Sequence, residues 1–148
     1  MQSIKRINLV YASQIGHTFY DTIRLDNQLT ATTRVGDTLL DTATILHFTT
    51  PPTLTYTEGE LETTCTLTVE VPQKFYEDIY KEMLTHEVGF AFIIMDAMNV
   101  SYLLGDEQLP IFEFTVQQNV YRPESGDTAC IITFTRTSDQ PFLRTLYL

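Results

Sequence analysis

The chain has 148 residues, with nine Lys and Arg against nineteen Asp and Glu, so its formal net charge is −10. That length suits one domain of typical size, and the 43% apolar content is that of a packed globular protein. The acidic balance disfavours binding to nucleic acid, which depends on basic side chains that neutralise phosphates. The longest apolar run, 88–95, falls far short of the roughly 20 residues of a membrane span, and residues 1–6 lead into no secretory signal.

Threonine is the most telling residue type, with 24 copies in the chain. Its β-branched side chain is stiff and suits the exposed face of a strand. The composition therefore predicts a β-rich domain.

The first half of the chain alternates between apolar and polar residues in several segments. Residues 4–12 predict a strand, whereas 13–27 has no clear period and is either a long loop or an irregular hairpin. Residues 28–50 predict a β-hairpin that turns at Gly36-Asp37 and ends at Pro51-Pro52. After a turn at Glu58-Gly59, residues 60–71 form the clearest strand.

One helix is predicted, over about residues 72–85. Pro72 is tolerated in a first helical turn. Apolar residues then recur at helical spacing and predict a buried stripe of Phe75, Ile79 and Met83, with Tyr76, Tyr80 and Leu84 beside them.

The second half predicts further strands separated by turns. The almost wholly apolar segment 88–96 is expected to be a central strand covered on both faces, followed by strands over 100–104, 111–121 and 128–137. We therefore expect a mainly β fold, an antiparallel β-sandwich or barrel with one packed α-helix, in a single domain over 1–148 with possible interaction arms at 13–27 and 141–148.

No sequence motif points to chemistry. Cys65 and Cys130 form no CxxC pair and lie on apolar faces, so we expect reduced, buried thiols; a disulfide between paired strands is the alternative. The three histidines have no metal spacing, and no nucleotide, dinucleotide or hydrolase motif occurs. We predict no catalytic residue, metal or cofactor. Two weaker readings stay open: a cation held by Asp106-Glu107 with Asp96 or Asp127, and a catalytic carboxylate pair.

The apolar segment 141–148 must either fold back on its own domain or dock on another subunit. Segment 13–27 is a second candidate arm. The residues expected to form an interface are Phe142, Leu143, Leu146, Tyr147, Leu148, Phe19 and Tyr20.

Residues 90–96, 102–111, the turn 125–127 and residues 131–134 together resemble small virion proteins of tailed phages and prophages of Bacteroides-type bacteria. The resemblance covers about residues 88–140. In that family the pattern is a strand, a leucine-glycine turn with an acidic residue, a proline-led strand, a glycine-containing turn and a final strand bearing phenylalanine. The resemblance implies a neck, ring or tail component of the virion, assembled in the bacterial cytoplasm, with no catalytic residues to carry over.

We therefore predict a non-enzymatic structural assembly protein whose partners are copies of itself in a ring and neighbouring virion proteins. The alternative is a β-sandwich module that binds carbohydrate or a cell surface. That module would line a groove with Tyr20, Tyr56 or Tyr102.

Overall fold

A computed structural model describes residues 3–14, 21–25, 28–34, 44–85, 89–105, 110–138 and 143–147. The strands form two sheets, one ordered β2-β3-β11-β8-β7-β1-β4 and the other β5-β6-β10-β9. The first sheet comprises β1 Ile4–Tyr11, β2 Asp21–Leu25, β3 Gln28–Arg34, β4 Thr44–Ile45, β7 Phe90–Asp96, β8 Ser101–Leu104 and β11 Leu143–Tyr147. The second comprises β5 Thr53–Glu58, β6 Thr63–Pro72, β9 Glu113–Arg122 and β10 Asp127–Ser138.

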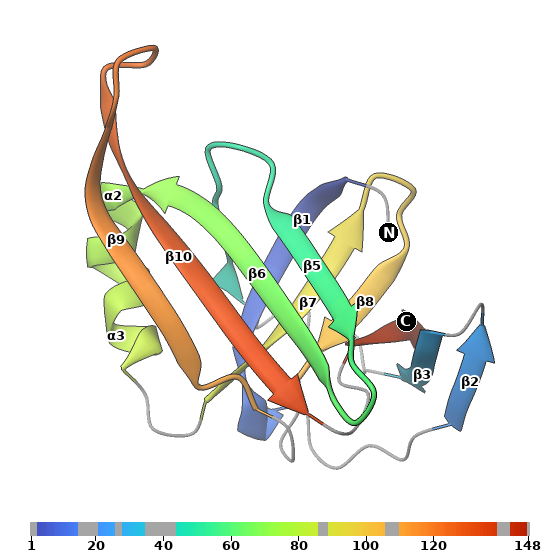
Figure 1. Ribbon diagram of the computed structural model, residues 1–148. Helices are drawn as coiled ribbons and strands as arrows, with labels where there is room; N and C mark the ends of the chain where they lie inside the picture. The colour runs from blue at the N-terminus through green and yellow to red at the C-terminus, as the bar shows by residue number, and fades with distance from the viewer. Residues whose placement is uncertain are drawn as a thin grey trace.

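The two sheets pack face to face, so the predicted β-sandwich is confirmed and the barrel alternative is not (Figure 1). Every described strand pair is antiparallel except β3 with β11, which run parallel. Among the described residues, the helical segments lack the length and hydropathy of a membrane span.

The core lies between the sheets and is rich in aromatic side chains. Phe134 of β10 packs edge-on against Phe92 of β7, with ring centroids 4.6 Å apart, and also contacts Phe90 and Phe114. On the other side of β7, Ile93 is buried as well, together with Leu103 of β8. The prediction that 88–96 holds a central strand covered on both faces is therefore confirmed for β7.

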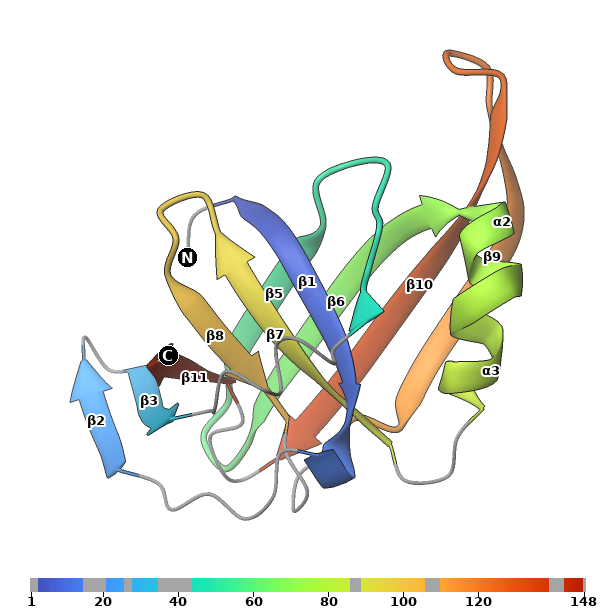
Figure 2. The ribbon, with the colours of Figure 1, turned by 180° about the vertical axis from the view of Figure 1, so that it is seen from behind.

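The predicted helix is present and stands at one end of the sandwich beside β9 and β10 (Figure 2). It runs through α2 Gln73–Phe75, a wider π-helical turn η2 Tyr76–Tyr80, and α3 Lys81–Leu84. The wide apolar stripe predicted for it is confirmed in part. Tyr76, Tyr80 and Leu84 are buried, whereas Phe75 and Ile79 stay more than a third exposed. The buried part of the stripe is therefore narrower than predicted.

The hydroxyl of Tyr80 gives one reason why this side of the helix faces the core. The Tyr80 hydroxyl donates to the Ile45 carbonyl and accepts from the His47 backbone N–H, both at 3.0 Å. A buried tyrosine is stable when its hydroxyl has partners, and here they tie the helix to the chain just after β4. His47 itself is exposed, with its ring 5.1 Å from that of Phe75.

The hairpin predicted over 28–50 is wrong. The strand at its start, β3, pairs with β2 and β11, whereas β4 pairs with β1 at the opposite end of the seven-stranded sheet. The turn Gly36-Asp37 lies outside the described residues. The strand β5 was not predicted, because Pro51-Pro52 and the turn at Gly59 leave only a short segment between them.

The cysteines are buried and free, as predicted. In the register of β6 and β10, Cys65 lies opposite Arg136 and Cys130 opposite Val71, so the two thiols do not face each other. A disulfide between them is therefore excluded in this fold. Burial raises the pKa of Cys65 to about 12 and that of Cys130 to about 11.

Candidate functional site

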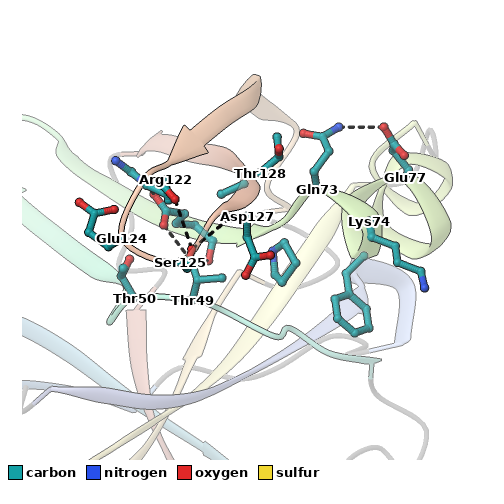
Figure 3. Close-up of a pocket in the computed structure, with 14 residues that line it drawn as sticks. Thr49, Thr50, Gln73, Lys74, Glu77, Arg122, Glu124, Ser125, Asp127 and Thr128 are labelled. Atoms are coloured by element: carbon teal, nitrogen blue, oxygen red, sulfur yellow. Dashed lines mark hydrogen bonds and ion pairs between the residues drawn. The ribbon is translucent and has the colours of Figure 1, made fainter.

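A groove of about 1020 Å³ lies beside the turn of the β9–β10 hairpin (Figure 3). Three elements form it: the end of the hairpin, the start of the helix and the segment Thr49-Thr50 that precedes β5. Its lining residues are Thr49, Thr50, Glu70, Pro72, Gln73, Lys74, Phe75, Glu77, Arg122, Glu124, Ser125, Asp127, Thr128 and Ala129.

An ion pair belongs to the lining of the groove. Arg122, the last residue of β9, donates from Nε to Glu70 Oε1 at 3.0 Å, and its Nη2 contacts the same oxygen. The Thr49 hydroxyl donates to Glu70 Oε2 at 2.8 Å. Glu70 is only 7% exposed, so these partners offset the cost of burying its charge. The hydrogen bond from Arg122 is the main reason that the pKa of the Glu70 carboxyl is lowered.

A second polar contact joins the helix to β9. The Gln73 side chain accepts from the Asn119 backbone N–H at 2.9 Å and donates to Gln118 Oε1 at 3.3 Å. Asn119 has a positive φ of 58° at a register shift between β9 and β10, where the local strand ladder is interrupted. Gln73 therefore satisfies a backbone group that the bulge takes out of the sheet.

These contacts fix the direction of the hairpin. Figures 1 and 2 show its turn extending well beyond the rest of the sandwich. We call this extension the arm and define it as residues 119–129. Gln73 holds its base through Asn119, and Glu70 holds Arg122, just before its turn. Tyr121, within the arm, is 63% exposed. An exposed aromatic side chain on a fixed projection is suited to contact another molecule.

Two polar side chains that line the groove are engaged within the fold. The most buried acid of the lining, Glu70, is occupied by Arg122 and Thr49. Ser125 bonds to the backbone of its own turn, accepting from the Asp127 N–H at 3.3 Å. Across the described part of the chain, no group of three or more His, Cys, Asp or Glu side chains could hold a metal ion.

The described residues do not support the interpretation that acidic turns hold a cation. Asp96 is buried, and its Oδ1 accepts from the backbone N–H groups of Met98 and Val100 at 2.9 and 3.0 Å. It thus stabilises the turn between β7 and β8. Asp127 lines the groove instead, directly after the turn of the arm. Asp106-Glu107 lies outside the described residues.

The predicted interface residues are only partly described. Leu143, Leu146 and Tyr147 lie in β11, whose backbone pairs with β8 on one side and β3 on the other. This stretch of the C-terminal segment therefore folds back on its own chain and offers no free strand edge. Phe142, Leu148, Phe19 and Tyr20 lie outside the described residues. The interface role of all seven residues stays a prediction.

The tyrosines that would line a carbohydrate groove are not gathered on one face. Tyr56 of β5 and Tyr102 of β8 belong to different sheets, and both pack against the core. Tyr20 is outside the described residues. The groove beside the turn of the arm is lined by no tyrosine.

No family model matches the chain, and neither the curated proteins nor the solved structures contain a significant match to it.

Sequence reasoning missed the groove. Glu70 continues the outward alternation of Thr64, Thr66 and Thr68, which predicts a solvated carboxylate. Arg122 belongs to a turn cluster 52 positions away. Only the pairing of β6 with β10 and of β10 with β9 brings these two charges together, and no local pattern encodes that pairing.

Proposed function

We propose that this protein is a non-enzymatic structural assembly protein, a neck, ring or tail component of a phage virion that forms a symmetric oligomer. The observation that carries the proposal is the arm: a rigidly based hairpin that projects from the sandwich and exposes Tyr121. A projection on one copy that contacts the body of the next makes a head-to-tail interface, which closes into a ring when the rotation between copies allows it.

The anchoring of the arm supports this role. A flexible hairpin would lose entropy when it docks, whereas a hairpin held by Glu70 and Gln73 has lost most of that freedom already. A fixed arm direction also sets a fixed rotation between neighbouring copies. Both properties favour a closed ring of defined size.

The virion assignment is supported by the resemblance of residues 88–140 to small phage virion proteins. That stretch contributes β7, β8, β9 and β10, and so includes the arm itself. In the proposed virion the neighbouring proteins would contact the ring on surfaces other than those between its copies.

The test compares two exposed apolar residues by sedimentation velocity. We expect Tyr121→Ser to shift the wild-type oligomer toward smaller species, because it removes the aromatic contact of the arm. Leu61→Ser is the matched control: Leu61 is 88% exposed, lies in the turn between β5 and β6, and is expected to leave the oligomer intact. If the two variants sediment alike, the arm takes no part in the contact between copies.

The virion role needs its own test. Particles released by the host should contain this protein at a constant number of copies per particle, measured by quantitative mass spectrometry against the major capsid protein. Absence from purified particles would contradict the virion assignment while leaving self-assembly standing.

A further inference from the structure

The outer face of the four-stranded sheet is covered with threonines in register. One row runs across all four strands, and two further rows lie beside it. In order across the sheet, the rows are Thr53, Thr68, Thr133 and Thr115; Thr55, Thr66 and Thr135; and Thr57, Thr64 and Thr137. The hydroxyls of Thr64 and Thr137 lie 3.1 Å apart, within hydrogen-bond distance across β6 and β10.

This face is open. Figure 1 looks directly onto it, and no described segment crosses in front of β5, β6, β10 or β9. Its threonines are all exposed or half-buried. The other sheet differs: residues on its outer side, such as Val10, Ile93 and Leu103, are almost fully buried.

The face carries almost no charge, although the chain as a whole carries −10. The acids beside the threonine rows are Glu113, opposite Thr135, and Glu70, which lies opposite Ile131 and is already paired with Arg122 through its carboxylate. Two copies of an acidic protein repel wherever their carboxylates meet. This face lets them approach without bringing many carboxylates together.

Threonine also suits contact between identical surfaces. Each hydroxyl can both donate and accept a hydrogen bond, so a threonine face is complementary to itself. The β-branched side chain has little rotamer freedom to lose on contact. Sheets of the same twist pack face to face at about −30°, and two copies of one sheet share their twist.

We propose that this threonine face binds the same face of a second copy across a two-fold axis. The inference rests on the proposed function and deepens it: the arm joins copies head to tail within a ring, and the threonine face joins two rings back to back. The copy number of the complete assembly is then even.

The test introduces one charge on each face. Thr66 is central, in the row between Thr55 and Thr135, and Thr66→Glu would place like charges close to the two-fold axis. We expect the mass of the native assembly, measured by native mass spectrometry, to fall two-fold. Met98→Glu adds the same charge in the turn between β7 and β8, where Met98 is 69% exposed, and is expected to leave the mass unchanged.

The other outcomes each have a definite meaning. A folded Thr66→Glu variant whose assembly keeps the wild-type mass would overturn the pairing of threonine faces, but it would not contradict the ring. Dissociation of this variant to 17.0 kDa monomers would make the face the ring contact itself and would overturn the two-fold pairing. A wild-type protein that is monomeric at all concentrations would overturn the proposed function, and this inference with it.

Cross-linking keeps the test decisive if Thr66→Glu does not fold. Thr66→Cys, Thr68→Cys and Thr133→Cys place a thiol at three central positions, and under mild oxidation we expect at least one of them to form a covalent dimer. The native thiols are buried and give no background. The matched control is Met98→Cys, which is expected to stay monomeric on a denaturing gel. The absence of a dimer from all three variants would overturn the proposal.

Discussion

Phe134 joins the two sheets through an aromatic cluster. It is 2% exposed and touches the rings of Phe90, Phe92 and Phe114, so its removal would leave a large cavity lined by both sheets. We expect Phe134→Ala to lower the free energy of unfolding by about 3–5 kcal/mol in urea denaturation. The control is Phe112→Ala, a half-exposed phenylalanine whose loss should cost about 1 kcal/mol or less. Equal losses would contradict the packing described.

Glu70 makes the stability depend on acid pH in a defined direction. Its pKa in the folded chain is lowered from the ordinary 4.5, so the unfolded chain binds the proton more readily. The stabilisation is fully present above pH 4.5 and is lost as the pH falls through the lower folded pKa. Thr49 and Arg122 provide it, by hydrogen bonds to the ionised carboxylate.

We therefore expect Glu70→Gln to flatten the fall in stability below pH 4.5, measured as the denaturation midpoint at a series of pH values. Glu82→Gln is a control on the exposed side of the helix. A wild-type profile that Glu70→Gln leaves unchanged would show that the Arg122 contact does not stabilise the folded chain.

The thiols of Cys65 and Cys130 should be inert in the folded protein. Both are buried, and burial raises their pKa values to about 12 and 11, so hardly any thiolate exists near neutral pH. We expect no labelling by a maleimide at pH 7.5 over the time in which the unfolded chain reacts at both sites. Rapid labelling of either thiol in the native protein would contradict this burial.

Gly89, just before β7, and Gly126, in the turn between β9 and β10, are a matched pair for comparing the packing of two loops. Both have a positive φ, 74° and 73°, so alanine strains the backbone at either position. Only at Gly89 would the added methyl also collide, 2.8 Å from Phe112 Cε1 and from Pro110 Cβ, whereas nothing lies within 4 Å at Gly126.

We expect Gly126→Ala to cost about 1–2 kcal/mol of unfolding free energy from backbone strain. Gly89→Ala should cost a further 1–3 kcal/mol or so, because the entry to β7 is close-packed. Thermal and chemical unfolding of the two variants would measure the difference. An equal loss of unfolding free energy in the two variants would show that the segment around Pro110 moves to make room for the methyl group at no further cost.

Elements with a strong local pattern were predictable from the sequence. The alternation from Thr63 to Val71, the apolar run of β7 and the helical spacing after Pro72 all correspond to observed elements. The wrong hairpin over 28–50 shows the limit of this reasoning. Threonine-rich segments favour strands, but they do not specify which neighbour each strand pairs with. The groove could not be predicted for the same reason, because Glu70 and Arg122 meet only through the pairing of strands that are far apart in the sequence.

The molecule as a whole combines three surfaces: an open threonine face, a projecting arm and a seven-stranded sheet whose outer side is buried at β1, β7 and β8. In an acidic chain of this kind, repulsion between copies is weakest where the carboxylates are sparse. The threonine face meets this condition. The arm carries Arg122, Glu124 and Asp127 and instead offers the exposed ring of Tyr121, in a different direction.

The most direct test of this account is the native mass of the wild-type chain at micromolar concentration. We predict one discrete species whose mass is an even multiple of 17.0 kDa. A protein that stays at 17.0 kDa as its concentration is raised a hundredfold would contradict the account.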